Sequence, residues 1–250
     1  ASMTQALAQR GVRGALEGFK ANPRLKNVVL DLRGNGGGLV ESAVEIVGFF
    51  VPKGTEVLRT RGREKNSEKI YKTPKNPILP DIPLAVLIDG GSASASEITA
   101  GAIQDLDRGV LVGSRSYGKG LVQGTRTLPY DGLLKVTIAK YYIPSGRLIQ
   151  ALDYSHRNPD GSVARTPDSL TNVYKTRAGR EVRDGGGLTP DTTVKWEKVS
   201  RLLYNIARDN WAFDYATKYA SENPTIASPE KFEITDTVYA DFKRSIDPAR

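Results

Sequence analysis

The sequence predicts an α/β fold in which helices pack on a sheet, followed by a helical extension. Short apolar runs rich in Val, Ile and Leu alternate with stretches whose apolar residues recur at helical spacing. Such runs are typical of buried strands, and strand–helix alternation is typical of α/β domains. The last part of the chain carries only helical patterns. We therefore expect a core over residues 1–195 and a helical extension over residues 196–250.

Each expected element follows from its apolar pattern. Helical spacing of apolar residues, which marks an amphipathic helix, occurs over 3–21, from 40 to near Pro52, and over about 96–107. Strands are expected where short apolar or alternating runs end in turn residues, at 28–32, 56–60, 84–88, 110–112 and 134–138. The chain turns irregular after Tyr142. Helical patterns return at 199–211, 213–221 and 236–246.

Composition limits the chemistry that this chain can perform. The absence of cysteine excludes disulfides, thiolate catalysis and cysteine-based zinc sites. The single histidine, His156, lies in an expected polar loop at 153–161, which leaves a Ser-His-Asp triad little to work with. We expect no metal and no cofactor. No apolar run approaches the roughly 18 residues of a membrane-spanning helix.

The basic charge does not indicate a nucleic-acid partner. The formal net charge is +8, but the basic residues are scattered among Gly, Pro, Ser and Asn. This distribution is typical of solvated loops, and it lacks the interleaved aromatic residues of a single-strand binder. We therefore expect no nucleic acid among its partners.

A serine-rich motif follows the buried strand at 84–88. Residues 91–98 (GSASASEI) lead through small side chains into a helix. The start of a helix offers free N–H groups and a positive dipole end, which suit an oxyanion. A serine-rich helix cap without chemistry is the other explanation. Glu97, in the first turn of this helix, is expected to stabilise the helix dipole only.

A lysine motif, residues 117–123 (YGKGLVQ), favours chemistry over a simple cap. Lys119 lies between two glycines, so its neighbours can bury the amine and lower its pKa. A neutral amine can take a proton from a serine hydroxyl, as in proteases that use lysine as the base. Gln123 can orient this amine by a hydrogen bond. An exposed loop lysine is the alternative.

Two glycine-rich patterns resemble nucleotide-binding motifs but fail in their last positions. Residues 113–119 open like a phosphate-binding P-loop, yet Gly120 replaces the Ser or Thr that binds magnesium. The glycines that begin at Gly34 follow a strand as a dinucleotide motif would, but Leu39 occupies the position of the third glycine. We expect the glycines at 34–38 to present backbone N–H groups, or to form a tight strand–helix turn.

Five segments, in this order, resemble the C-terminal processing peptidases, also called tail-specific proteases. The matching segments are VVLDLRGNGGGL at 28–39, SASASEI at 92–98, YGKGLVQ at 117–123, YIPSGRLIQ at 142–150 and GLTPD at 187–191. The resemblance implies a crotonase/ClpP-like core and a Ser-Lys endopeptidase that binds protein or peptide substrates by their C-terminal segment. It also implies a location in the bacterial periplasm or cell envelope, and it leaves a homo-oligomer open.

The resemblance assigns a role to each motif residue. It implies that Ser94 is the nucleophile, Lys119 the base and Gln123 the residue that orients the amine. It places the oxyanion donors on the backbone N–H groups of Ala95 and of either Gly37 or Gly38. Family members usually carry a PDZ domain before the helix that begins this chain, and we expect that domain upstream.

Two other classes of protein remain open from the residues alone. One is a non-catalytic binding module on a crotonase-like core. The other is an acyl-CoA enzyme of similar fold, which would need catalytic carboxylates near the glycine loops.

Overall fold

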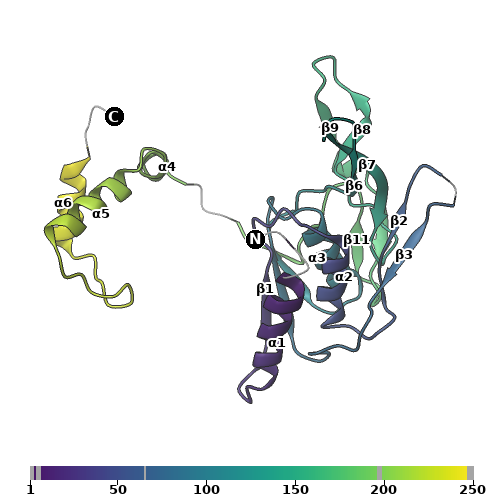
Figure 1. Cartoon of the computed structure of the whole chain (residues 1–250), viewed down its shortest axis with the longest axis horizontal. Coiled ribbons are helices and arrows are strands. Elements are labelled where there is room, and N and C mark those ends of the chain that lie inside the picture. The colour runs from purple at the N-terminus through teal and green to yellow at the C-terminus, as the bar shows by residue number, and fades with distance from the viewer. Residues whose placement is uncertain (1–2, 4–6, 65, 196–198, 247–250) are drawn as a thin grey trace. The chain divides into compact units, whose positions relative to one another are not determined.

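The computed structural model describes residues 3, 7–64, 66–195 and 199–246. The chain divides into two compact units, Ala1–Lys195 and Trp196–Arg250 (Figure 1). The first unit contains sheets covered by helices, and the second contains helices. The expected α/β fold with C-terminal helices is confirmed.

The first unit contains a four-stranded parallel sheet. Its strand order is β1-β4-β5-β12. The strands are β1 (Val28–Asp31), β4 (Leu84–Ile88), β5 (Val110–Gly113) and β12 (Thr192–Thr193). Parallel strands need crossover connections, and helices α2 (Val40–Gly48) and α3 (Ala95–Asp105) follow β1 and β4 respectively. Both helices therefore begin at the same edge of the sheet.

Helix α3 is the buried centre of this unit. All 11 of its residues are buried, and it contacts α2, β5 and strand β2 of a second sheet. Close packing depends on Gly101, where a Cβ atom would lie only 2.8 Å from Cδ1 of Ile143 and 3.1 Å from Cδ2 of Leu188. A helix enclosed on all sides holds its first turn in a fixed place, and that first turn carries the serine motif.

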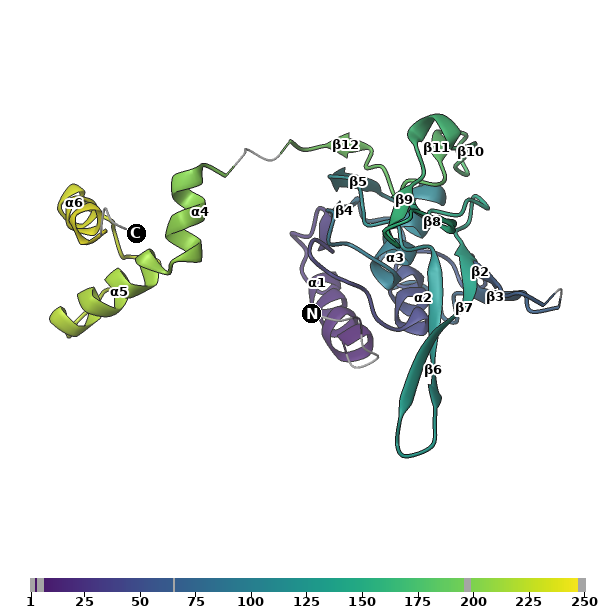
Figure 2. The same ribbon diagram turned by 90° about the horizontal axis from the view of Figure 1, so that it is seen from above.

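The second sheet is antiparallel, with strand order β3-β2-β7-β6. Its strands are β2 (Glu56–Arg61), β3 (Lys69–Lys72), β6 (Leu121–Thr127) and β7 (Leu133–Tyr142). Strands β6 and β7 form a long hairpin that projects from the unit (Figure 2). In this hairpin Gln123 pairs with Thr137 and Thr125 pairs with Lys135. The register places these four residues on one face of the hairpin, because paired residues share a face.

The segment after Tyr142 is more regular than its sequence predicts. It forms two hairpins, β8 (Leu152–Arg157) with β9 (Val163–Arg165), and β10 (Val173–Lys175) with β11 (Glu181–Arg183). A single turn of 3₁₀ helix, Asp168–Leu170, joins the two hairpins. His156 lies in β8 rather than in a loop, and its side chain is outside the described residues. The strands have only three to six residues, too few for alternation to be recognised.

The N-terminal helix begins later than its pattern predicts. A π-helical turn, Leu7–Val12, leads into α1 (Arg13–Lys20). Residues 4–6 of the predicted helix lie outside the described residues. Met3 is not helical: its N–H donates to the Gly37 carbonyl at 2.7 Å, and its carbonyl accepts from the Leu39 N–H at 2.9 Å. Burial of its side chain against the core, with 2% exposed, outweighs the weak helical preference of a stretch that contains Gly11 and Gly14.

The second unit contains α4 (Arg201–Arg208), α5 (Trp211–Glu222) and α6 (Asp236–Ser245). Helix α4 starts after Ser200, whose hydroxyl caps it by accepting from the Leu203 N–H. It ends before the predicted residue 211 because Asn210 adopts a left-handed conformation with φ of 57°. Helices α5 and α6 pack through an edge-to-face contact between Tyr215 and Phe242, with ring centroids 5.5 Å apart.

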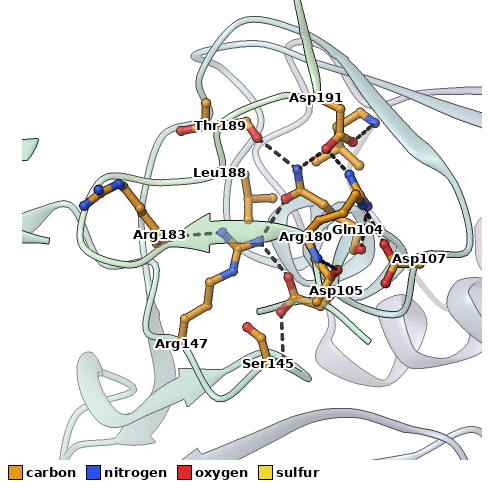
Figure 3. A network of polar contacts seen from close by, with 12 residues as sticks. Gln104, Asp105, Asp107, Ser145, Arg147, Arg180, Arg183, Leu188, Thr189 and Asp191 are labelled. Carbon is orange, nitrogen blue, oxygen red and sulfur yellow. Dashed lines mark hydrogen bonds and ion pairs between the residues drawn. The ribbon is translucent and has the colours of Figure 1, made fainter. Parts of the chain in front are cut away.

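A buried ion pair holds the far end of α3 (Figure 3). The Arg147 guanidinium, 1% exposed, donates to Asp105 Oδ1 at 2.7 Å and to Gln104 Oε1 at 2.8 Å. It also donates to the Arg183 carbonyl at 2.9 Å. The other Asp105 oxygen accepts from the Ser145 N–H at 3.0 Å. The charge of the buried Asp105 carboxylate is therefore neutralised by Arg147, and both of its oxygens accept hydrogen bonds although they have no contact with water.

The network continues from Gln104 to the last strand of the core. The Gln104 amide donates to the Thr189 carbonyl and to Asp191 Oδ1, both at 3.0 Å. Asp191 Oδ2 in turn accepts from the Leu111 N–H at 2.7 Å, which ties β12 to β5 beside their ladder. Arg180 bridges Asp107 and Asp191 on the exposed side.

We predict that Arg147→Ala destabilises the chain by about 3–5 kcal/mol, because it leaves the Asp105 carboxylate buried without a cation. Urea unfolding measures the change. The control is Arg115→Ala, which breaks an exposed bidentate pair with Asp168 and is expected to cost less than about 1 kcal/mol. Equal losses in the two variants would contradict this account of the network.

Candidate active site

The loops that follow β1 and β4 lie against each other. The carboxyl ends of neighbouring parallel strands meet at one edge of a sheet, where α/β proteins place their sites. The Asn35 carbonyl accepts from the Ala93 N–H at 3.1 Å and from Ser96 Oγ at 2.8 Å. Ser92 Oγ donates to the Leu32 carbonyl at 2.8 Å. Ser92 and Ser96 are buried and join the two loops, so their hydroxyls serve the structure.

Ser94 differs from its two neighbouring serines. It is partly exposed and caps α3 with φ of 58° and ψ of −118°, a conformation that costs a non-glycine residue about 1–3 kcal/mol. Its N–H donates to Glu97 Oε2 at 3.0 Å, which holds the turn in this shape. The strain therefore belongs to the serine whose hydroxyl remains available.

Two glycines hold Lys119 close to the rest of the core. Gly118 and Gly120 have φ of 81° and 66°, which disfavour a side chain. A Cβ atom would lie 2.4 Å from Cβ of Ala151 at position 118, and 2.5 Å from Cβ of Gln150 at position 120. The backbone thus passes directly over the segment after Pro144, and this explains why the lysine has glycine on both sides.

Lys119 and Ser94 come together as the sequence predicts. Lys119 Nζ lies 3.5 Å from Ser94 Oγ. Burial lowers the pKa of Lys119, the positive charge of Lys135 lowers it further, and the Glu97 carboxylate opposes both effects. Desolvation, as expected, is therefore the main cause of the lowered pKa of Lys119. The effect of Glu97 on the pKa of Lys119 corrects the expectation that this glutamate only stabilises the helix dipole.

Glu97 is the central acceptor of the site. Its side chain is fully buried, and burial raises its pKa more than the surrounding hydrogen bonds lower it. Its Oε1 accepts from Ser116 Oγ and the Gly118 N–H, both at 2.6 Å, and its Oε2 accepts from the Ser94 N–H at 3.0 Å, the Lys119 N–H at 3.0 Å and the Tyr141 hydroxyl at 3.4 Å. One carboxylate thus joins the serine turn, the lysine loop and β7.

The sequence alone does not reveal this role of Glu97. A glutamate three residues after a helix cap is explained by the cap itself, and nothing local indicates donors from 116–119 and 141. Ser116 and Tyr141 each stand one residue before a later motif, and a serine or a tyrosine at such a position is too common to indicate a contact with Glu97.

Two adjoining cavities open at this position. The larger, of about 510 Å³, is lined by residues 34–38, Ser94, Lys119 and Lys135. The smaller, of about 160 Å³, shares Ser94, Lys119 and Lys135 and adds Gln123 among others. Gln123 is thus close to the lysine. Among the described residues, however, no hydrogen bond joins its side chain to Lys119, so its orienting role stays a prediction.

The two expected oxyanion glycines are not equivalent. The Gly37 N–H donates to Asn35 Oδ1 at 3.0 Å, so it is already engaged. The N–H groups of Gly38 and Ala95 have no acceptor among the described residues. The Gly37 backbone is in close contact with the serine turn, since a Cβ atom at this position would lie 2.8 Å from the Ala95 nitrogen. This favours Gly38 over Gly37 as the partner of Ala95.

Comparisons with known proteins show the family of this chain. Residues 1–163, more than half of the chain, match the family model described as Peptidase family S41. The chain belongs to peptidase family S41. This membership favours a serine-type peptidase over the acyl-CoA enzyme and the non-catalytic module that the sequence left open. Residues 202–249 match a second model, described as Probable PDZ-protease, C-terminal helical domain.

Individual proteins similar to this S41 chain are also proteases. It is 46% identical over 129 residues to a carboxy-terminal-processing protease of Bartonella bacilliformis, covering 52% of this chain and 30% of the relative. It is 32% identical over 216 residues to a probable CtpA-like serine protease of Staphylococcus aureus, covering 84% of this chain and 41% of the relative. The chain thus spans less than half the length of these curated relatives.

A solved structure shares the fold. The photosystem II D1 C-terminal processing protease matches with a TM-score of 0.54 at 26% identity, over 83% of this chain and 44% of that one. The resemblance to C-terminal processing peptidases that the five motifs indicated is confirmed.

We predict that Glu97→Gln impairs both stability and catalysis in this S41 chain. An amide has one acceptor oxygen, so its NH₂ group must face N–H donors that the carboxylate now satisfies. Unfolding should become easier by about 1–3 kcal/mol, and kcat should fall by about 100-fold as the serine turn and lysine loop separate. Urea unfolding and peptide hydrolysis measure the two effects.

The matched control is Glu41→Gln. Glu41 lies in the first turn of α2 as Glu97 lies in the first turn of α3, but its side chain is exposed. Loss of a dipole interaction alone costs less than about 1 kcal/mol. If the two substitutions have similar effects, Glu97 only stabilises its helix.

Proposed function

We propose that this chain is the catalytic part of a serine endopeptidase in which Ser94 and Lys119 form a Ser-Lys dyad. The observation that carries the proposal is the 3.5 Å approach of Lys119 Nζ to Ser94 Oγ at the wall of a cavity. The lowered pKa of Lys119 supports it, because only a neutral amine can accept a proton from the serine. No other described titratable side chain makes a hydrogen bond with the Ser94 hydroxyl.

The proposed reaction has two halves. Neutral Lys119 removes the proton of Ser94 Oγ, and Oγ attacks the carbonyl carbon of the scissile peptide bond. The resulting oxyanion accepts hydrogen bonds from the N–H groups of Ala95 and Gly38. Lys119 then gives its proton to the leaving amine, the C–N bond breaks, and an acyl ester on Ser94 remains. Water, deprotonated by Lys119, then attacks this ester. The ester C–O bond breaks, Lys119 returns the proton to Ser94 Oγ, and the acid product leaves.

Glu97 and Gln123 are assigned supporting roles. Glu97 does not touch the reacting atoms and is a positioning residue for Ser94 and Lys119. Gln123, on the neighbouring strand at the smaller cavity, is proposed to accept a hydrogen bond from the Lys119 amine when substrate closes the site. Hydrogen bonds in an empty site are often long and shorten only in the complex.

The proposed substrates are proteins bound by their C-terminal segment. This rests on the names of the relatives, which describe carboxy-terminal processing in those proteins. We also propose a location in the bacterial periplasm or cell envelope, since the curated relatives are bacterial. Within the described part of the chain, no helix has both the length and the apolar character to span a bilayer.

We predict that Ser94→Ala abolishes cleavage of an unstructured protein substrate and leaves the chain folded, with a loss of about 1 kcal/mol of stability from the missing cap of α3. Removing the hydroxyl removes the proposed nucleophile but little packing, because Ser94 is partly exposed. Ser92→Ala and Ser96→Ala are expected to lose about 1 kcal/mol of stability each, since their hydroxyls bond to buried carbonyls, but to retain cleavage. Cleavage by Ser94→Ala at the rate of the parent chain would refute the proposal.

We predict that Lys135→Met moves the acid limb of the kcat/KM profile to higher pH. Lys135 disfavours the charged form of Lys119 by repulsion, so its removal raises the pKa of Lys119, and a higher pH is needed to obtain the neutral base. Profiles are recorded for the parent chain, Lys135→Met and His156→Ala. If the limb stays in place in Lys135→Met but disappears in His156→Ala, the base is the histidine and not Lys119.

A further inference from the structure

Lys135 is a second amine at the mouth of the site, and the proposed reaction does not use it. It lies on β7, exposed to solvent, and its backbone pairs with Thr125. Its side chain lines both cavities together with Ser94 and Lys119. The hydrogen bonds of the long β6–β7 hairpin fix the position of the Lys135 backbone.

No acidic group in the described part of the chain forms an ion pair with Lys135. Among the described residues its ammonium makes no hydrogen bond and no ion pair. The residues that line the larger cavity include two lysines and no carboxylate. Glu97, the buried acid beneath the site, already accepts from five donors. The cavity is therefore electropositive, and such clefts concentrate anionic ligands.

The two lysines are not equivalent as ligands for an anion. Lys119 must give up its proton to act as the base, so a substrate cannot depend on its charge. Lys135 then remains the cation of the cavity. A volume of about 510 Å³ lies within the roughly 300–1,000 Å³ of ordinary ligand pockets, so it can hold substrate residues next to the scissile bond.

We propose that Lys135 is a specificity-determining residue that binds a carboxylate of the peptide substrate beside the scissile bond. The inference rests on the proposed peptidase function. The carboxylate has two sources in a peptide, an Asp or Glu side chain or the terminal carboxylate. Both would form a partly solvated ion pair with the Lys135 ammonium, and both would be rejected by a negative charge at this position.

The experiment compares peptides that differ only in this charge. In one series, amidated peptides carry a single Glu or Gln at each position around the cleaved bond. In the other, peptides that end shortly after the bond are compared as free acid and amide. The quantity is the ratio of kcat/KM for the charged and the neutral peptide on the same enzyme, because a changed pKa of Lys119 cancels in that ratio.

We expect the full chain to prefer the charged peptide by about threefold to fivefold at one position, the strength of an exposed ion pair. The preference should disappear in Lys135→Met, reverse in Lys135→Glu, and weaken at high salt. Lys140→Met is the matched control, because Lys140 is an exposed lysine of the same strand that lines neither cavity. The position that responds, side chain or terminus, identifies the source of the carboxylate.

Fluorescence anisotropy measures binding of the same peptides to Ser94→Ala. This measurement separates the role of Lys135 from the proposed peptidase function. A preference for the charged peptide that depends on Lys135 supports this inference even if no peptide is cleaved. Equal binding and equal cleavage of charged and neutral peptides in both series would overturn it. Cleavage that survives Ser94→Ala would instead refute the proposed function and leave the Lys135 test intact.

Discussion

The arrangement of this site depends on one buried carboxylate. Glu97 lies where three segments far apart in the sequence meet, and each segment donates to it a hydrogen that would otherwise be buried without a partner. Desolvating an acid is costly, and the surrounding donors offset that cost only if all three segments are in place. Ser94 and Lys119 therefore take their relative position from a carboxylate that accepts from the backbone N–H of both residues.

Backbone conformation supports the same geometry from both sides. Ser94 has a positive φ that it would not adopt alone, and Gly118 and Gly120 allow the lysine loop to pass within van der Waals contact of its neighbours. The helix behind Ser94 cannot move to relieve the strain, because it is enclosed on every side. The electrostatic environment follows from this rigidity: Lys119 is desolvated where it is held, and Lys135 adds its repulsion from strand β7.

The strands and helices that carry the motifs were predictable, because 28–32, 84–88 and 95–105 have strong local patterns. That Ser94 and Lys119 lie close together could be predicted from the order and spacing of the five motifs. Glu97 and Lys135 could not be predicted in their roles, because these depend on pairings across distant segments. Glu97 has the sequence signature of a helix cap, and Lys135 occupies one position in an alternating strand. Met3 was assigned to a helix because no local pattern shows that its backbone pairs with 37–39.

The polar network at the end of α3 has a consequence for the order in which the chain becomes complete during synthesis. Asp105 and Gln104 lie early in the core sequence, but their partners come from residues 145–191, and the strand that completes the sheet is the last of the core. A ribosome-bound chain that has emerged only through the lysine loop carries Ser94, Glu97 and Lys119 without the segments that fix the helix beneath them. The full set of hydrogen bonds that hold the end of α3 can therefore exist only once residues up to Asp191 have left the ribosome.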